Sequence, residues 1–410
     1  TIQMYMSVGR TSDALALIDR GAVLFPKSTR LRFMASDIYA LQKNKDTALK
    51  WAQEAYKVSE GSVSAGVALA MFYARNNMDA LYRSQIEALQ KEHPESPEPY
   101  LLEATILRTK GDLEGALKAA RKARELKDST QIRTMIAQIL LEKKETAQAK
   151  AMLDESIQKD PKDILSRVLL AQIYLDEKNA TKALELLGEP LKTAALSPDV
   201  ASTAAQAYLL KGDNKKAREL VENALKENDQ NIVLHRMMAK IHFLQGEFTK
   251  ALGETDLLIK HAVSTPDILY VGALSALRST GPQAALPYIQ SLKEKAPDEW
   301  ITLHAQLRYY LDQNDRKSAY PIAEKAINLY PENEEALAFY ASLAPGAVGW
   351  QQAAEKVKAI CAKTGTAGCH MVMSALLEGS GKKDLALAEI KKAIEIDPKK
   401  DAYYHALAQY

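Results

Sequence analysis

The chain is poor in the residues that form tight turns and cross-links. Its 410 residues include 18 glycines, 15 prolines and 2 cysteines. An all-β protein of this length needs many glycine- and proline-rich turns, so the composition argues against that class. With 47% hydrophobic and 26% charged residues, the sequence is typical of an ordered protein. We therefore expect an all-α fold.

The sequence also lacks an excess of one charge and a long apolar run. Its 54 Lys and Arg residues nearly balance 52 Asp and Glu residues, which leaves a net charge of +2. So small a charge gives no overall field that would attract nucleic acid or an anionic membrane surface. No stretch reaches the roughly 18 consecutive apolar residues that a membrane-spanning helix requires. We expect neither a nucleic-acid partner nor a membrane span in this segment.

Motifs for catalysis and metal binding are missing as well. The sequence contains no H-E-x-x-H, C-x-x-C or G-x-S-x-G motif and no glycine-rich phosphate loop. His235 and His242 lie on one expected helix, but no third ligand is in register with them, so we interpret them as core residues. We expect no catalytic residue, no metal and no cofactor.

What the sequence does contain is a repeat of 34 residues. Steps of 34 residues from Ala116, two of them shortened to 33, reach an alanine almost every time. Eleven of the twelve positions reached, which we call anchors, are alanine, and the twelfth is Tyr82; chance would give about one alanine in ten. The alanine anchors are Ala14, Ala48, Ala116, Ala149, Ala183, Ala217, Ala251, Ala285, Ala319, Ala353 and Ala386.

Four other positions keep the same register. Often a tyrosine lies nine residues before the anchor, a glycine five before it, an alanine seven after it and a proline twelve after it. Small residues let two helices approach closely, and the aromatic ring fills the space between them. The glycine permits a tight turn, and the proline begins the next unit. Examples are Tyr174 and Tyr208, Gly111 and Gly212, Ala123 and Ala224, and Pro161 and Pro297.

Each unit is thus a first helix, a turn, a second helix and a link, and it must stack on its neighbours to bury its apolar face. This pattern resembles the tetratricopeptide repeat (TPR), a 34-residue helix pair. The resemblance covers residues 1–410. It implies a right-handed α-solenoid superhelix of about twelve units, with the first helices on the concave face. Because the sequence starts at Thr1 without a Met, we expect one continuous array that is a fragment of a longer chain.

Two parts of the array depart from the regular pattern. Pro287 and Pro321 each lie two residues after an anchor, inside a second helix, and predict a local bend or a change in superhelical curvature. The sequence LAPGAVGW at 343–350 predicts a first helix that is cut short, and KTGTAGC at 363–369 predicts a glycine-rich link. Residues 344–368 are therefore the candidate flexible or irregular region.

The two cysteines leave alternatives open. Cys361 is expected late in a second helix and Cys369 early in the next first helix. A short loop between them can bring their Cα atoms within disulfide distance, and a disulfide would indicate an oxidising compartment such as a periplasm. Two buried thiols at small-residue positions fit the periodicity equally well. Cys369-His370 also ends a Cys-x7-Cys-His string, but haem attachment normally uses C-x-x-C-H.

The first helices supply candidate residues for a ligand groove. Gln138, Gln172 and Gln206 occupy the same repeat position in three consecutive units. Their amides form a predicted ladder of donors and acceptors for an extended peptide backbone or for sugar hydroxyls. The alternative is a polar wall that is merely solvated.

A predicted basic stretch follows the glutamine ladder. Its members are Arg236, Lys240, His304 and Arg308, with Tyr270, Phe243 and Phe339 nearby. Such a stretch suits an acidic ligand or a C-terminal carboxylate, although a solvated face explains it as well. The Lys and Asn pattern with which some TPR domains clamp a chaperone's C-terminal carboxylate is absent.

We interpret the chain as a non-catalytic scaffold that binds a protein or peptide in the concave groove, with a polysaccharide as a second candidate ligand. Long arrays rich in Ala, Lys and Leu also look like bacterial envelope TPR proteins associated with exopolysaccharide export and surface-protein sorting. That likeness favours a periplasmic or other extracytoplasmic location over a cytoplasmic one. The alternative is the recognition arm of a larger enzyme, such as a glycosyltransferase, or of an outer-membrane exporter, with its functional domain outside this segment.

Overall fold

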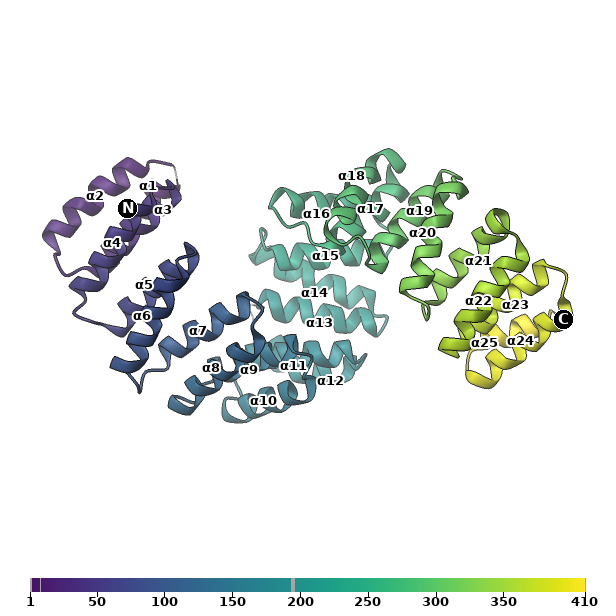
Figure 1. The fold of residues 1–410 in the computed structure, drawn as a ribbon, viewed down its shortest axis with the longest axis horizontal. Helices are drawn as coiled ribbons and strands as arrows, with labels where there is room; N and C mark the ends of the chain where they lie inside the picture. Colours follow the sequence, from purple (N-terminus) through teal and green to yellow (C-terminus); the bar gives the residue numbers. More distant parts are fainter. Residues whose placement is uncertain (1, 8, 193–195, 410) are drawn as a thin grey trace. The chain divides into compact units, whose positions relative to one another are not determined.

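Every regular element in the described part of the chain is a helix (Figure 1). The computed structural model describes residues 2–7, 9–192 and 196–409, and within these ranges it contains no strand. The all-α fold class is therefore confirmed. None of the helices in these ranges is both long enough and apolar enough to cross a membrane.

The chain divides into two compact units, Thr1–Gly188 and Glu189–Tyr410. The helices of the first unit are α1 (Ile2–Ser7), α2 (Thr11–Leu24), α3 (Thr29–Leu41), α4 (Lys45–Val58), α5 (Val63–Arg75), α6 (Asp79–Glu92), α7 (Glu98–Thr109), α8 (Leu113–Leu126), α9 (Thr130–Glu142), α10 (Thr146–Lys159), α11 (Ile164–Asp176) and α12 (Ala180–Leu187). The second unit begins with the 3₁₀ helix η1 (Pro190–Lys192). Its α-helices are α13 (Pro198–Leu210), α14 (Asn214–Glu227), α15 (Ile232–Leu244), α16 (Phe248–Lys260), α17 (Pro266–Ser279), α18 (Pro282–Lys295), α19 (Trp300–Asp312), α20 (Arg316–Leu329), α21 (Glu334–Val348), α22 (Trp350–Thr364), α23 (Ala367–Gly379), α24 (Lys383–Ile396) and α25 (Asp401–Leu407).

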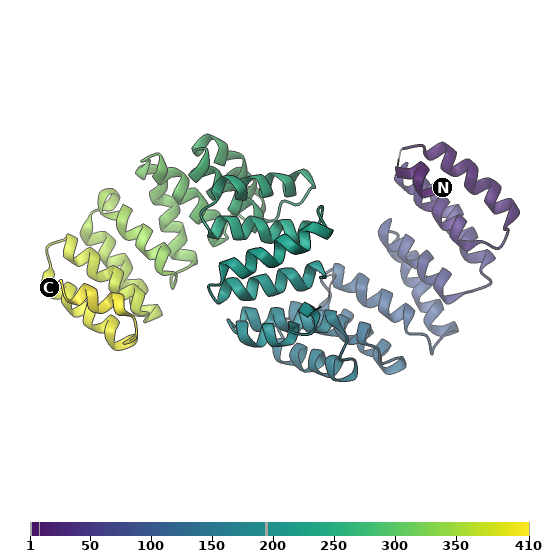
Figure 2. The same cartoon turned by 180° about the vertical axis from the view of Figure 1, so that it is seen from behind.

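Within each unit the helices form pairs that lie side by side in both views (Figures 1 and 2). Most odd-numbered helices pack most closely against the even-numbered helix that follows, as α3 does with α4 and α17 with α18, whereas α21 packs more closely against α20 than against α22. These are the predicted first and second helices. Some first helices also pack directly on the next first helix, as in α5 with α7, α13 with α15, and α15 with α17. First helices therefore lie next to one another along one face of a unit.

The alanine anchors lie on the second helices and are fully buried. All eleven of them have an exposed fraction of 0%. A larger side chain at this point would force the helix axes apart, because helices packed at 8–10 Å leave room only for small residues at the contact. Tyr82, which replaces the alanine in one unit, is 6% exposed.

A left-handed residue makes the turn between the two helices of each pair. Gly111 and Gly212, five residues before their anchors, have φ angles of 82° and 78°. Lys144 and Lys178 occupy the same position and keep the same conformation, with φ angles of 64° and 61°. A residue with a Cβ atom costs roughly 1–2 kcal/mol there. The turn geometry is thus retained even where the sequence offers no glycine.

In five of the pairs the side chain of the next residue caps the second helix. The side chain of Asp112 accepts a hydrogen bond from the backbone N–H of Gly115 at 2.9 Å, and Asp315 accepts one from Ser318 at 3.0 Å. Such caps satisfy a backbone donor that the first helical turn leaves unpaired. A left-handed residue followed by a capping residue therefore sets where the second helix begins.

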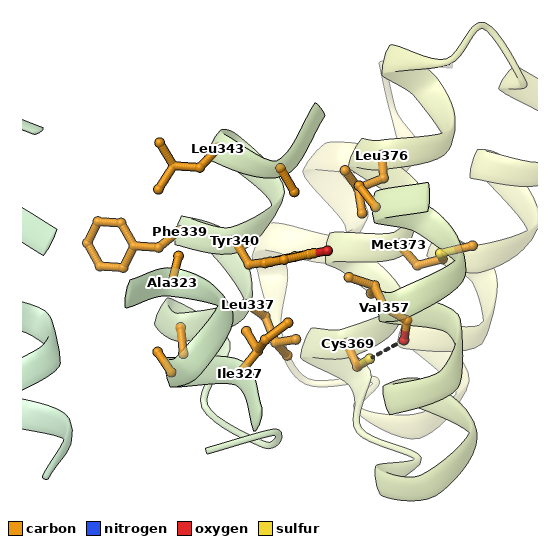
Figure 3. Close-up of a cluster of buried hydrophobic side chains, with 14 of the residues drawn as sticks. Ala323, Ile327, Leu337, Phe339, Tyr340, Leu343, Val357, Cys369, Met373 and Leu376 are labelled. Carbon is orange, nitrogen blue, oxygen red and sulfur yellow. Dashed lines mark hydrogen bonds between the residues drawn. The ribbon is translucent and has the colours of Figure 1, made fainter. Parts of the chain in front are cut away.

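One core of the second unit is shown in Figure 3. Phe339 and Tyr340 are neighbours on α21 but point in opposite directions. Tyr340 is 1% exposed and packs in a cluster with Val357 of α22 and Met373 of α23. The ring of Phe339 lies 5.7 Å from that of His304 on α19, measured between centroids. Helix α21 thus joins the core on one side to the face of first helices on the other.

The continuity of the array over residues 1–410 stays a prediction. The 34-residue spacing continues past residue 188, where the chain divides into two compact units. Helix α12 has 8 residues, whereas α10 has 14, and Gly188 and Pro190 follow it. The expected early end of the first helix near 344 is wrong, because α21 continues to Val348 with Pro345 inside it.

Other local expectations agree with the structure. Pro287 lies inside α18 and Pro321 inside α20. Residues 350–364 and 367–379 are helical, so the link in the candidate irregular region 344–368 is reduced to Gly365 and Thr366. The flexibility of that region stays a prediction.

The turn geometry predicts opposite effects for two glycines of the second unit. Gly212→Ala should lower the free energy of unfolding by about 1 kcal/mol, because alanine is strained at φ 78°. Gly253→Ala should raise it by about 0.5–1 kcal/mol, because Gly253 lies inside α16 with open space around its Cα. Urea denaturation of the two variants measures both changes. Equal effects of the same sign would contradict this account of the turn.

Candidate functional site

A hollow of about 320 Å³ lies on the face of the first helices in the second unit. We call it the aromatic pocket. Its lining residues are Phe243, Phe248, Tyr270, Leu274, Leu277, Arg278, His304, Arg308, Asp312 and Glu335. All except Phe248 come from the first helices α15, α17, α19 and α21. Four of them, Phe243, Tyr270, His304 and Arg308, are among the residues that the sequence predicts for the groove.

The repeat itself brings Tyr270 and His304 together. They are 34 residues apart and so occupy equivalent positions on α17 and α19, which pack against each other. The hydroxyl oxygen of Tyr270 lies 2.9 Å from Nδ1 of His304. The other ring nitrogen, Nε2, lies 3.0 Å from a carboxylate oxygen of Glu335 on α21. One hydrogen-bonded chain therefore links three successive first helices.

The contacts indicate which nitrogen of His304 carries the proton. A carboxylate can only accept a hydrogen bond, so Nε2–H donates to Glu335 and Nδ1 accepts from the Tyr270 hydroxyl. Nε of Arg308 lies farther from Nε2, at 3.3 Å. Burial raises the pKa of Tyr270 to about 12, so its hydroxyl keeps the proton that it donates.

Aromatic rings enclose His304. Its ring centroid lies 5.5 Å from that of Trp300, 5.7 Å from that of Tyr270 and 5.7 Å from that of Phe339. The residue is 5% exposed, and burial lowers its pKa from the ordinary value of 6.5 although Glu335 acts in the opposite direction. His304 is therefore neutral at pH 7. Its predicted role as a basic residue of the groove is wrong, because its ring is buried among other rings.

Arg308 is held in place by two contacts. Its guanidinium lies 3.1 Å from a carboxylate oxygen of Glu335 and 5.0 Å from the centroid of the Phe339 ring. A planar guanidinium stacks well on an aromatic face. Arg308 therefore forms part of the pocket wall, with its charge partly compensated by Glu335.

The other predicted basic residues lie outside the pocket. Arg236 and Lys240 are exposed on α15 and do not line it. Arg236 forms an ion pair of 2.7 Å with Asp267 on α17. The four predicted cations thus do not form one basic surface, because one is neutral and two carry carboxylate partners.

Sequence reasoning missed Arg278, which lines the pocket from α17. It lies four residues after Leu274, one helical turn farther along the same face. Arg278 is exposed, and within the described ranges no carboxylate pairs with it. Extending the inward-facing register by one turn would have identified it, together with Asp312, which follows Arg308 in the same way.

The predicted glutamine ladder is distributed over both units. Gln138 on α9 and Gln172 on α11 belong to the first unit, and Gln206 on α13 belongs to the second. All three are half-buried. The amide oxygen of Gln138 accepts a hydrogen bond of 3.0 Å from Arg108, so part of its capacity is used within the protein. Ligand binding by the ladder stays a prediction.

Cys361 and Cys369 form a disulfide, with their Cα atoms 5.5 Å apart. It joins the end of α22 to the start of α23 across the short link at Gly365. Cys369 is 0% exposed, and its sulfur lies 3.7 Å from the carbonyl oxygen of Val357 (Figure 3). The alternatives of two free thiols and of haem attachment do not agree with this structure, because each sulfur is bonded to the other.

His235 and His242, which the sequence predicts as core residues, are paired with carboxylates. Nδ1 of His235 lies 2.7 Å from Glu254, and Nδ1 of His242 lies 2.7 Å from Glu247. His242 is 7% exposed, as expected for a core residue. Across the described ranges no group of three or more His, Cys, Asp or Glu residues is arranged to hold a metal.

Family comparisons agree with the helix-pair architecture. Residues 3–62, 140–207 and 367–400 each match a tetratricopeptide repeat family. The chain contains tetratricopeptide repeats. These repeats generally mediate protein–protein interactions, and none of the three matching families is an enzyme family. A comparison with curated proteins gives no match.

Solved TPR-like structures resemble the chain at low sequence identity. The human IFIT1 dimer with PPP-AAAA is 16% identical over 90% of this chain and 90% of its own, with a TM-score of 0.56. Cut9–Hcn1 of the APC/C hetero-tetramer is 10% identical over 100% and 94%, with a TM-score of 0.48. A TPR protein from Parabacteroides merdae is 15% identical over 59% and 96%, with a TM-score of 0.45. At these identities the IFIT1 similarity supports the α-solenoid fold alone.

The buried histidine predicts a pH dependence of stability. Because the folded-state pKa of His304 lies below 6.5, the unfolded chain takes up this proton at a higher pH than the folded chain. Stability should therefore be lost as the pH falls from about 7 through the folded pKa. In His304→Gln, which cannot titrate, the loss between pH 7.5 and 5.5 should be smaller. Urea denaturation followed by tryptophan fluorescence measures this loss of stability; an unchanged pH dependence in His304→Gln would contradict the assignment.

Proposed function

We propose that the second unit binds a segment of a partner protein in the aromatic pocket, and that the chain acts as an interaction scaffold. The observation that carries this proposal is a preformed hollow, lined by aromatic and aliphatic side chains together with polar ones, with the exposed Arg278 at its edge. The hollow supplies Phe243, Phe248 and Tyr270 for an apolar side chain, and Arg278 for an acidic group. Small sites of this kind, mostly apolar with a few polar groups that fix orientation, are typical of ligand binding.

The pocket is rigid before any ligand arrives. Tyr270, His304 and Glu335 hold one another through hydrogen bonds of 2.9 and 3.0 Å. Arg308 is fixed by the same carboxylate. A ligand that enters does not have to order these side chains, so little conformational entropy is lost on binding.

The charges favour a particular ligand. Glu335 already compensates Arg308, and Asp312 also lines the pocket, so two arginines face two carboxylates. Arg278 is exposed and offers its guanidinium donors to solvent. Guanidinium groups bind carboxylates with two parallel hydrogen bonds. We therefore expect the partner segment to carry an aromatic or aliphatic side chain close to an Asp, a Glu or a C-terminal carboxylate. A polysaccharide offers no such charge unless it is acidic.

A peptide library displayed on phage tests this function with the complete chain as bait. Selected peptides should share an apolar residue next to an acidic one. Their dissociation constants, measured by fluorescence anisotropy, should increase about 10-fold in Arg278→Ala, the loss expected for one charge-assisted contact. The matched control is Arg20→Ala, which removes an exposed arginine from α2 in the first unit.

Either of two results would contradict the proposal. The selected peptides could lack any acidic residue, or Arg278→Ala and Arg20→Ala could have the same effect. Circular dichroism of both variants should match that of the parent chain, because both residues are exposed.

The bacterial envelope setting stays a prediction. The disulfide between Cys361 and Cys369 supports an oxidising compartment, and thiol alkylation of protein isolated without reductant tests whether the bond is present.

A further inference from the structure

A second and larger hollow lies among the last complete helices of the chain. Helices α22, α23 and α24 enclose a groove of about 810 Å³, which we call the outer groove. Helix α23 forms its floor, and the second helices α22 and α24 form its walls. Its principal lining residues are Trp350, Ala354, Lys358 and Cys361 on α22; His370, Met373 and Leu377 on α23; and Leu385, Glu389 and Lys392 on α24. None of them belongs to the aromatic pocket.

Each helix contributes one continuous face to the outer groove. On α24 the lining residues are spaced by four and three, and on α22 Trp350, Ala354, Lys358 and Cys361 recur every four or three residues. Gln351, Glu355 and Ala362 on α22 and Gly379 on α23 widen these faces. Helices α22 and α24 both pack against α23, which holds the two walls apart. The shape is that of three helices with space for a fourth.

The two ends of the outer groove differ in chemistry. The chain direction alternates from helix to helix, so the start of α22, the end of α23 and the start of α24 lie at the same end. Trp350, Leu377 and Leu385 meet there, and Trp350 and Leu385 remain 42% and 55% exposed. Lys358 and His370 lie toward the opposite end, about two helical turns or 10 Å away. Lys382, at the start of α24, also lies at the apolar end, so a lysine lies at each end of the outer groove.

Two features fix the walls before anything binds. The ring of Trp350 lies against Gly379, where an added Cβ atom would come within 2.2 Å of the ring. At the opposite end the disulfide of Cys361 and Cys369 ties α22 to α23. The outer groove is thus a preformed surface rather than a loose gap between helices.

The charges around the outer groove favour an acidic occupant. Its lining contains three lysines and two glutamates. Glu389 is already engaged, because it lies 2.5 Å from Nδ1 of His370 and 2.8 Å from Nζ of Lys392. Glu355 accepts a hydrogen bond from the neutral amide of Gln351 at 3.3 Å and keeps its charge, so the excess of positive charge in the lining is small. Lys358 and Lys382 are exposed, and among the residues that the structure describes neither has a carboxylate partner.

We propose that the outer groove is a second docking surface and that it binds an amphipathic α-helix of a partner protein. The apolar stripe of that helix packs on Trp350, Leu377 and Leu385, and its Asp or Glu residues pair with Lys358 and Lys382. A helix presents an apolar stripe and charged flanks at the spacing of these three walls. The chain then holds two partner segments at once, one in each hollow.

The test uses the complete chain and a designed probe. The probe is a fluorescein-labelled helix of about 18 residues with one stripe of leucines flanked by glutamates. A scrambled probe keeps its composition but loses the stripe, and a third probe replaces Glu by Lys. Fluorescence anisotropy should show saturable binding of the first probe, and at least 10-fold weaker binding of the other two.

Single substitutions locate the binding. Leu385→Glu should weaken the binding of the first probe at least 10-fold, and Lys358→Glu about 5-fold. The matched control is Leu81→Glu, which places the same charge on another exposed leucine, 43% exposed against 55% for Leu385, on α6 of the first unit; it should leave binding unchanged. Arg278→Ala should also leave it unchanged, so that this result does not depend on the proposed function of the aromatic pocket.

Three results would overturn the proposal. The scrambled probe could bind as tightly as the striped one, Leu385→Glu could bind as well as Leu81→Glu, or light scattering could show a dimer that Leu385→Glu dissociates. The last result would make a second copy of this chain the occupant of the outer groove.

Discussion

The close approach of two helices at an alanine is the constraint on which the rest of the structure depends. At all eleven alanine anchors the side chain is fully buried between the helices of a pair. A methyl group there allows the two helices to pack at short distance along their length. Each pair then presents an apolar edge to the next pair, and stacking is the only way to bury it. The fold is thus one short-range contact repeated along the chain.

This constraint also creates the two candidate sites. Equivalent positions of neighbouring first helices are 34 residues apart, so Tyr270 and His304 stack in register and connect through a hydrogen bond of 2.9 Å. The aromatic pocket results from large side chains at such positions. The outer groove results from the other face, where α23 holds α22 and α24 apart. One face offers a compact hollow with a free guanidinium, and the other offers an open groove suited to a helix.

The fold could be predicted from the sequence because the residues at the helix contacts recur every 34 residues. The site could be predicted only in part. Alanine anchors, turn glycines and the residues Tyr270, His304 and Arg308 follow from the register alone. The burial of a side chain does not follow from the register. The sequence therefore predicts a cation at His304, although three rings surround it. Arg278 lies one helical turn beyond the two inward-facing positions of each first helix from which the groove residues are predicted. The division of the chain at residues 188–189 coincides with the short helix α12 and Gly188. The spacing of the anchors continues across it, so the repeat pattern does not predict the division.

The central claim is tested most directly by two leucine substitutions on one helix. Ala149 is an anchor of α10 with 0% exposure, and Ala151, two residues later, is exposed. Ala149→Leu should lower the free energy of unfolding by about 1–3 kcal/mol, the usual cost of an overfilled helix contact, while Ala151→Leu should change it by less than about 0.5 kcal/mol. Urea denaturation of both variants provides the comparison. Equal stability of the two variants would show that the fold does not depend on close helix contact at the anchors.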